Sequence, residues 1–404
     1  MEGRTWEMNL RLFPGHVLAG LLALCVALPA HADSTGVTAT SIKIGFIGSL
    51  TGPAAIWGSG NLAGAALAFE QQNEAGGVNG RKFEWVSIDD ESSAPKGIAG
   101  FNRLVQTEQV FAVIGPSASA VGVPMKSVLA SSNVPVIIPS FSSPDMTEPV
   151  IRNVFRTGTL NDRMQGRAMV NYLVGVLKFD RVAIMRQSDQ YGATGTAAIT
   201  ARLKELGKAP VAVETFNASD TDVTSQVLHL RSADPQAIVV YGYPAASAIA
   251  TRQIRELGIK AQILGSSATS NQNYPEMVGK VGIGAKFVVA GNSLPESDDK
   301  PMADFRAAFQ KRYPDLTRQG RPATSDVLGY GAAKNVIEAL RRAGKDLTRE
   351  NFMAALETFD GFDSGVTLPT YLSSTNHEGN SLMRIAIITP ELTREILPGS
   401  FDAK

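Results

Sequence analysis

Two serine-rich runs are the residues of this chain best suited to do chemistry. Residues 116–120 read Pro-Ser-Ala-Ser-Ala, and residues 140–145 read Ser-Phe-Ser-Ser-Pro-Asp. Each run follows a short apolar segment, and the first leads into a helical pattern. Hydroxyl groups and the unpaired N–H groups at a helix start bind anions, because both donate hydrogen bonds near the positive end of the helix dipole. The two runs therefore predict a site for a ligand carboxylate, with simple helix capping as the alternative.

The elements that carry these runs alternate between short apolar strands and longer helical patterns. Strands are expected at 42–50, 83–89, 111–115 and 135–139, with helices at 62–74, 95–108 and 121–131. The alternation restarts after 156–160, with strands at 181–186, 211–216, 237–241 and 261–265 and helices at 163–177, 195–206, 221–230 and 245–257. A strand at 287–290, helices at 302–313, 325–342 and 349–356, and extended segments at 366–368 and 382–389 follow.

This pattern predicts an α/β fold with two doubly wound lobes. Apolar strands flanked by helices are typical of parallel sheets that are buried on both faces. Ligands of such sheets bind beyond the carboxyl ends of the strands, where loops and helix starts meet. The serine runs lie at such positions, so the sequence predicts a ligand cleft between the lobes.

The N-terminal segment predicts export. Arg11, an apolar run at 17–28 and the small residues at 30–32 have the order of a secretory signal, with cleavage expected after Ala32. The apolar run is shorter than the roughly 20 residues that span a bilayer. Cys25 lies in this segment and is the one cysteine of the chain, so no disulfide or thiol chemistry is expected after it. The 38 basic and 38 acidic residues balance, which indicates neither a nucleic-acid nor a membrane surface.

A glycine pattern imitates a cofactor site. Gly58, Gly60 and Gly64 follow a predicted strand, and two aspartates at 89–90 end the next one, as in a dinucleotide fingerprint. The spacing to the last glycine is one residue too long, and an exported protein does not meet cytoplasmic nucleotides. The glycines are better explained as positions where the backbone turns closely beside a ligand. The acidic run at 89–91 is better explained as a strand end than as a metal site.

Residues 115–119 faintly resemble the nucleophile elbow of a serine hydrolase. A hydrolase also needs a base, but His229 falls in a predicted helix and His377 in a C-terminal loop. These histidines are also too few and too far apart for a histidine-based metal site. The sequence therefore predicts neither an enzyme nor a metal or cofactor protein.

Seven motifs occur in the order and spacing of one known family. They lie at residues 44–53, 73–80, 89–90, 113–115, 139–147, 155–157 and 190–192. The chain after residue 32 resembles the periplasmic leucine–isoleucine–valine-binding proteins, which are the solute receptors of ABC importers. The resemblance implies two α/β lobes that are joined by three hinge crossovers and close on a ligand.

The resemblance also implies where the lobes divide. Lobe 1 is expected at 33–157 plus 291–366, and lobe 2 at 158–290 plus 367–404. The hinges are expected at 156–158, 290–292 and 366–369.

The first lobe of the family holds the carboxylate of an amino acid. The matching residues here are Ser119, Ser140 and Ser142, with Phe141 in the same loop. Trp57 matches an aromatic side chain that covers the ligand. These residues are therefore the expected carboxylate site.

The second lobe departs from the family. Tyr191 and Tyr243 match ligand-facing tyrosines, but Ser267 stands where the family has a glutamate for the ligand ammonium. A buried ammonium without a carboxylate is costly. Either the ligand lacks an ammonium group, or another acid supplies the charge, with Asp326 and Asp189 as candidates.

Together these features predict a monomeric periplasmic solute-binding protein that performs no chemistry and delivers its ligand to a membrane ABC permease. A small carboxylate is the expected ligand, with an organic or aromatic acid favoured, because residues 266–271 form a hydroxyl-rich wall. An amino-acid receptor with a relocated ammonium site and a ligand-sensing module remain alternatives. Closure is expected to follow a population shift, in which ligand favours the closed form.

Overall fold

Two separate β-sheets organise the part of the chain that the structure describes. The computed structural model describes residues 34–289, 291 and 293–402. The predicted signal peptide at 1–32 and the predicted hinge positions 290 and 292 lie outside the described residues.

The first sheet has five parallel strands in the order β2-β1-β3-β4-β5. They are β1 (Ser41–Gly48), β2 (Lys82–Asp89), β3 (Ala112–Ile114), β4 (Val136–Ile138) and β5 (Val154–Arg156). The helices α1 (Ala55–Glu74), α11 (Thr324–Ala343) and α12 (Arg349–Leu356) share one apolar core with this sheet, and α2 (Ala94–Gln106) and α3 (Ser119–Ala130) share another. Along β1, Ile44 belongs to the first core and Ile47 to the second, so the strand contacts helices on both faces.

The second sheet has the order β14-β13-β10-β9-β8-β6-β7, with β15 paired to β13. Its strands are β6 (Val182–Gln187), β7 (Val213–Phe216), β8 (Ala237–Tyr241), β9 (Gln262–Gly265), β10 (Lys286–Val289), β13 (Leu382–Ile388), β14 (Arg394–Ile396) and β15 (Phe401–Asp402). Strands β6 to β10 are parallel, whereas β13 runs antiparallel to β10, β14 and β15. The fold is therefore α/β with two lobes, as predicted, and an antiparallel edge ends the second sheet.

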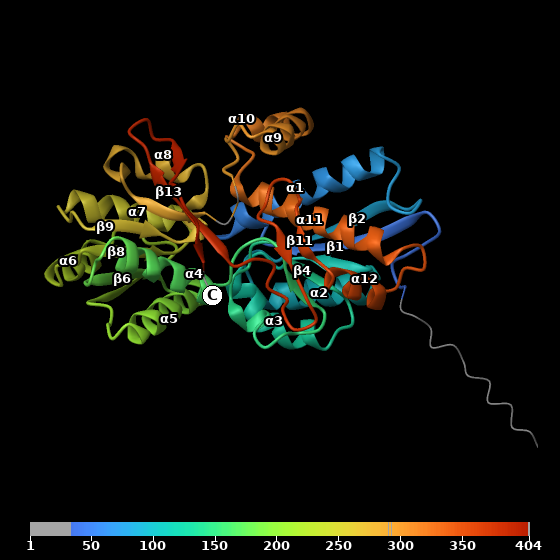
Figure 1. Cartoon of the computed structure of the whole chain (residues 1–404), viewed down its shortest axis with the longest axis horizontal. Helices are drawn as coiled ribbons and strands as arrows, with labels where there is room; N and C mark the ends of the chain where they lie inside the picture. The colour runs from blue at the N-terminus through green and yellow to red at the C-terminus, as the bar shows by residue number, and fades with distance from the viewer. Residues whose placement is uncertain (1–33, 290, 292, 403–404) are drawn as a thin grey trace, which may run out of the picture. The chain divides into compact units, whose positions relative to one another are not determined.

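Helices cover both faces of the second sheet as well (Figure 1). One core contains α4 (Asp162–Val170), the π-helical turn that continues it (Asn171–Val176) and α5 (Gln190–Glu205). The other contains α6 (Thr224–Ser232), α7 (Pro244–Glu256) and α8 (Tyr274–Val278).

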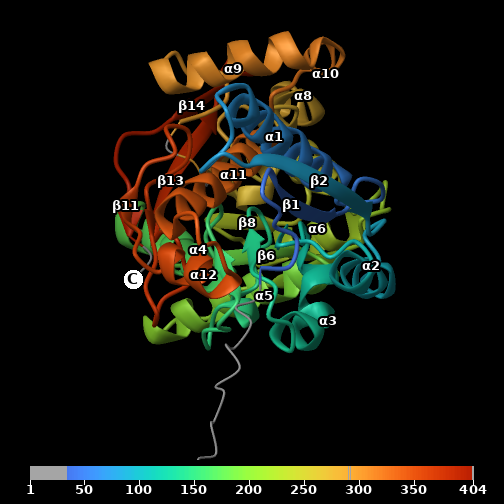
Figure 2. The same cartoon turned by 90° about the vertical axis from the view of Figure 1, so that its right-hand side faces the viewer.

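The remaining elements are peripheral. Helix α9 (Lys300–Arg312) packs on α1 and α11 through an apolar cluster, and the short α10 (Pro314–Arg318) follows it (Figure 2). A two-stranded sheet joins β11 (Asp360–Phe362) and β12 (Thr370–Tyr371), and 3₁₀ turns lie at Pro144–Met146, Ser267–Ser270 and Lys280–Gly282. Among the described residues, no helix has the length and apolar character needed to cross a membrane.

Helix α1 begins earlier than predicted, at Ala55, and this corrects the interpretation of the glycine pattern. A Cβ atom on Gly60 would lie 2.0 Å from Ser325 Oγ, and one on Gly64 would lie 1.9 Å from the Asp326 carbonyl oxygen. These glycines are inside α1 and allow it to pack closely against α11. They form neither a phosphate-binding turn nor a turn beside a ligand.

The segment that precedes β13 lies beside the chain after β10 and beside the end of β5. Isolated bridges join Gly291 to Thr367 and Arg156 to Glu378. Leu372 still packs in the core of the first sheet, and the second sheet resumes with β13. The lobe boundaries themselves stay a prediction.

Candidate functional site

A pocket between the two lobes collects most of the predicted site residues. Its empty space, including its opening, amounts to about 350 Å³. It is lined by Trp57, Ser117, Ala118, Ser119, Ser140, Phe141, Ser142, Thr159, Tyr191, Tyr243, Ser267 and Ala268. Eight of the nine predicted residues are in this lining, and Asp326 is not.

The fold explains why residues so far apart in sequence meet here. The loops that follow β3 and β4 contribute the serines of the first lobe, and the segments that follow β8 and β9 contribute Tyr243 and Ser267. Parallel strands end at the same edge of a sheet, so the loops at their carboxyl ends lie together. Thr159, which the sequence did not single out, comes from the crossover between β5 and α4.

The first lobe presents two buried polar atoms without a partner. In the described part of the chain, neither Ser119 Oγ nor Trp57 Nε1 has a hydrogen-bond partner. Ser119 is 2% exposed and Trp57 is 5% exposed. Ser119 is the first residue of α3, and the helix start has no side-chain cap. Capping therefore does not account for this serine, and both atoms are free to donate to a ligand.

Other serines of the same wall are already engaged. Ser140 Oγ accepts from Asn61 Nδ2 at 2.6 Å and donates to the Ser117 carbonyl oxygen at 3.3 Å. Ser117 Oγ accepts from the Ser49 backbone N–H at 3.0 Å. These bonds hold the two serine loops and α1 together. Neither histidine of the hydrolase alternative lines the pocket, so Ser117 has no base there.

The second lobe contributes an aromatic wall. The rings of Tyr191 and Tyr243 stack with their centroids 5.4 Å apart, and Tyr241 packs against Tyr191 at 4.7 Å. Burial raises the pKa of all three phenols, so they stay neutral and keep their hydrogen-bond donors. Trp57 of the first lobe belongs to the same apolar cluster as Tyr191. The ligand space therefore lies between aromatic groups of both lobes.

The wall around Ser267 carries no acid. The Ser267 backbone N–H donates to Gln165 Oε1 at 2.7 Å, and the Ala268 N–H donates to Tyr191 Oη at 3.4 Å. None of the lining residues is an aspartate, glutamate, lysine or arginine. A ligand charge must therefore be balanced by dipoles or by groups behind the lining.

Asp326 lies outside the pocket because its carboxylate has a structural role. It forms an ion pair with Arg321, and its Oδ2 accepts from the Ala323 N–H at 2.6 Å at the start of α11. Asp189 is also engaged. Its Oδ1 accepts from the Gly192 N–H at 3.0 Å and so caps α5, while its Oδ2 accepts from Gln187 Nε2 at 2.9 Å. Neither acid lines the pocket.

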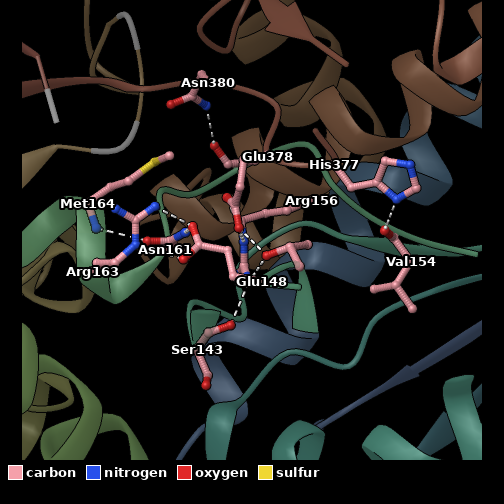
Figure 3. A network of polar contacts seen from close by, with 12 residues as sticks. Ser143, Glu148, Val154, Arg156, Asn161, Arg163, Met164, His377, Glu378 and Asn380 are labelled. Atoms are coloured by element: carbon pink, nitrogen blue, oxygen red, sulfur yellow. Dashed lines mark hydrogen bonds and ion pairs between the residues drawn. The ribbon is translucent and has the colours of Figure 1, made fainter. Parts of the chain in front are cut away.

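A charged network fixes the loop that carries Ser142 (Figure 3). Arg156 Nη2 donates to the Ser143 carbonyl oxygen at 2.7 Å, and Arg156 Nε lies 3.1 Å from Glu378 Oε2. The Thr147 hydroxyl donates to Glu378. Arg156 is at the end of β5 and Glu378 lies between β12 and β13, so this network joins the ligand loop to two segments that lead from the first sheet to the second.

A second cluster in the same view holds the end of that loop (Figure 3). Glu148 accepts from Arg163 Nε at 2.7 Å and from Asn161 Nδ2 at 2.8 Å. Asn161 Oδ1 in turn accepts from the Met164 N–H at 2.8 Å and caps α4. The loop is therefore held at Ser143, Thr147 and Glu148, all of which follow the pocket serines in the chain.

Comparison with known proteins identifies the fold and the class. The family model described as "Periplasmic binding protein" matches residues 41–391. The chain belongs to the periplasmic binding protein family. It is 30% identical to Leu/Ile/Val-binding protein homolog 3 of Brucella melitensis over 355 residues. The aligned region covers 88% of this chain and 90% of that protein. It is thus a solute-binding protein and not an enzyme.

A further relative agrees with this assignment, and two solved structures share the fold. The leucine-, isoleucine-, valine-, threonine- and alanine-binding protein of Pseudomonas aeruginosa is 27% identical, over 83% of this chain and 84% of that one. A leucine-binding protein of Thermotoga maritima superimposes with a TM-score of 0.77 at 23% identity, over 89% of this chain and 99% of that one. A branched-chain amino acid transporter substrate-binding protein from Streptococcus pneumoniae, solved with isoleucine, superimposes with a TM-score of 0.77 at 24% identity, over 89% of this chain and 99% of that one.

Proposed function

We propose that this protein is a periplasmic receptor that binds a small carboxylate-bearing solute between its lobes for a branched-chain-amino-acid-type ABC importer. The observation that carries the proposal is the pair of buried, unpartnered groups Ser119 Oγ and Trp57 Nε1. A buried polar group without a partner costs about 1–3 kcal/mol. A ligand carboxylate at the start of α3 removes that cost and also gains from the helix dipole.

The class of carboxylate follows from two opposing observations. The relatives are named as amino-acid-binding proteins, which makes an α-amino acid the first candidate. Ser267 lacks the acid that the family uses for the ammonium, which makes an organic or aromatic acid the second candidate. The uncharged lining accommodates both classes.

The cleft continues beyond Tyr243. That residue also borders a hollow of about 1050 Å³, open to solvent, whose walls include Pro53 and Ile56 from the first lobe and Ala245 and Met277 from the second. This mostly apolar hollow suits the entry of the ligand and leaves room for a longer apolar body.

The proposed mechanism is a population shift between open and closed lobes. The first-lobe donors capture the carboxylate, and Tyr191 and Tyr243 contact the ligand as the second lobe closes. Ligand favours closure only as far as it binds the closed form better. After removal of residues 1–32, the monomeric protein presents its closed form to a membrane permease. A sensing role uses the same site and differs only in the partner.

A thermal-shift panel on refolded, ligand-free protein tests this proposal. The panel pairs leucine with 4-methylpentanoate and phenylalanine with 3-phenylpropanoate, so that each pair differs in the ammonium group. A ligand at about 100 times its dissociation constant stabilises the fold by roughly 2.7 kcal/mol. A shift with at least one member of a pair is expected, and no shift with any carboxylate overturns the proposal.

A further inference from the structure

A further hollow lies between α4 and the segment that leads into β13, and we call it the β13 hollow. Its empty space, including its opening, amounts to about 1020 Å³, and small-molecule sites usually occupy about 300–1,000 Å³. Of the described residues, none lines both this hollow and the cleft pocket. Its apolar walls are formed by Met164, Leu368, Pro369, Tyr371 and Leu382. The hollow therefore has the size of a ligand site and is separate from the cleft.

Two walls of the β13 hollow expose large apolar side chains to solvent. Tyr371 of β12 is 49% exposed and Leu382 of β13 is 41% exposed. The walls formed by Met164 and Leu368 are buried. An apolar solute that enters the hollow removes surface of Tyr371 and Leu382 from water, which is favourable. These walls therefore suit a compact apolar body.

The polar end of the hollow offers a hydrogen-bond acceptor. Asn380 lines the hollow and is 9% exposed, and its Oδ1 is buried without a hydrogen-bond partner among the described residues. Its Nδ2 donates to the Gly158 carbonyl oxygen at 3.1 Å. A carbonyl oxygen only accepts, so the amide nitrogen must face Gly158 and the amide oxygen is left for a solute. Figure 3 shows this oxygen on the side of the amide toward Met164.

The charge of the hollow is balanced within the chain. Glu378 is the one charged side chain among the described lining residues, and it lies 3.1 Å from Nε of the buried Arg156. A charged solute would meet no free counter-charge here, and burial of an unpaired charge is costly. A carboxylate would also face the oxygens of Glu378 and Asn380. The hollow therefore favours a neutral solute.

We propose that the β13 hollow is a second ligand site, for a neutral solute that carries an N–H donor on a compact apolar body, such as a primary carboxamide. The N–H group donates to Asn380 Oδ1, and the apolar body packs against Tyr371, Leu382 and Met164. A carboxylate, which is the ligand proposed for the cleft, has no such donor and carries a charge. The two sites thus select different head groups, and this inference does not depend on the proposed function.

The first test uses 4-methylpentanamide as the probe and methyl 4-methylpentanoate as its matched control, which has the same apolar body but no N–H donor. Binding to the wild-type protein is measured by saturation-transfer NMR titration, with and without excess leucine or 4-methylpentanoate. The amide is expected to bind with a dissociation constant on the order of 1 mM, as suits a ligand of this size. Neither carboxylate is expected to displace it. The ester is expected to bind at least about threefold more weakly, because it makes no hydrogen bond to Asn380.

The second test removes one wall at a time. Leu382→Ala truncates an exposed apolar wall and leaves the buried polar groups in place, so the variant is expected to fold. Its affinity for the amide is expected to fall at least about threefold. The matched control is Leu228→Ala on α6, because Leu228 is 40% exposed and lies outside the hollow. This control is expected to bind the amide as wild type does.

A third variant addresses the acceptor. Asn380→Leu removes Oδ1 at similar side-chain volume, so the preference for the amide over the ester is expected to disappear. This variant also loses the hydrogen bond to Gly158. If it does not fold, the comparison of Leu382→Ala with Leu228→Ala still decides the proposal.

Several outcomes would overturn the second site. They are no binding of the amide, displacement of the amide by leucine or 4-methylpentanoate, equal binding of amide and ester by wild type, and equal amide affinities in Leu382→Ala and Leu228→Ala. None of these outcomes bears on the proposed function, because the thermal-shift panel measures carboxylate binding in the cleft. If no carboxylate shifts the protein in that panel, the proposed function fails while the variants still test the β13 hollow.

Discussion

Two buried polar regions meet in the loop after β4, and they differ in how their polar groups are satisfied. On one side, Ser142 faces a pocket whose lining carries no charged side chain and includes unpartnered donors. On the other side, the carbonyl oxygen of Ser143 accepts from Arg156, whose guanidinium is paired with Glu378. Ser142 thus belongs to a neutral region in which some polar groups have no partner without ligand. Ser143, the next residue, belongs to a charged region whose groups are mostly paired within the chain.

The comparison separates buried acids that are paired with an arginine from a buried acid that is not. Burial alone would raise the pKa of Glu148, but the hydrogen bond and charge of Arg163 lower it overall. Asp162 is buried without a hydrogen-bonded cation, and burial raises its pKa. A carboxylate with its own arginine contributes to the fold at neutral pH, whereas a buried carboxylate without a hydrogen-bonded cation lowers stability there.

The largest effect is expected from breaking the charged region. The Arg156 side chain is 0% exposed. Glu378→Gln removes the charge that pairs with it and so leaves a buried cation without that counter-charge. Breaking a buried pair in this way costs about 3–5 kcal/mol. The measurement is the free energy of unfolding by denaturant titration in the absence of ligand. A loss below about 1 kcal/mol would mean that the pair is not important for the fold.

The same comparison predicts the opposite behaviour for Ser119. Ser119→Ala removes a buried hydroxyl that has no partner in the ligand-free protein, so the free energy of unfolding is expected to rise, by up to the about 1–3 kcal/mol that such a group costs. Affinity for the ligand is expected to fall by roughly 1–3 kcal/mol, because a carboxylate oxygen loses its donor. Calorimetric titration and denaturant unfolding of the same preparation check both parts. A stability loss without an affinity loss would place Ser119 in the structural region.

The sequence predicted the parts of both regions that depend on order along the chain. The serines after β3 and β4, Tyr243 and Ser267 follow strands, and the topology of a parallel sheet brings such positions together. The engagement of Asp326 by Arg321 depends on three-dimensional burial, which a sequence pattern does not show. The residues near each acid in the sequence do not show which acid has an arginine partner in the folded protein and which has none.

Two further features escaped the sequence for physical reasons. Asp162 follows a crossover and precedes a helix, where an acidic residue is ordinary because it favours the helix dipole. Its hydrogen bonds come from Tyr241 and Thr194, which belong to other elements. The early start of α1 was hidden because glycine usually weakens a helix, whereas here Gly64 allows close contact with α11.

A smaller effect is expected at the other unpartnered donor. Trp57→Phe keeps an aromatic ring against the second-lobe cluster but removes Nε1–H, which is buried without a partner. The affinity for the ligand is expected to fall by about 0.5–1.5 kcal/mol, the usual net worth of one hydrogen bond. Trp57→Ala is the comparison variant, since it removes the ring as well and is expected to lose more. Equal affinity in wild type and Trp57→Phe would show that Nε1 does not meet the ligand.

The last expected effect is a pH dependence of stability that distinguishes the two kinds of buried acid. Burial raises the pKa of Asp162 above its ordinary value, which is about 3.9 in an unfolded chain. Below that pH the residue is protonated in both states and contributes no pH dependence. As pH rises from there to the folded pKa, the folded state keeps a proton that the unfolded state has lost, so the free energy of unfolding falls.

Asp162→Asn abolishes this contribution. The stability of wild type relative to Asp162→Asn is therefore expected to decline as pH rises above about 4, with a slope of at most roughly 1.4 kcal/mol per pH unit for a single group. Ligand-free protein is unfolded with denaturant at a series of pH values to measure this difference. A relative stability that rises with pH in the ligand-free protein would show that a cation of the chain itself already compensates Asp162, as Arg163 does for Glu148.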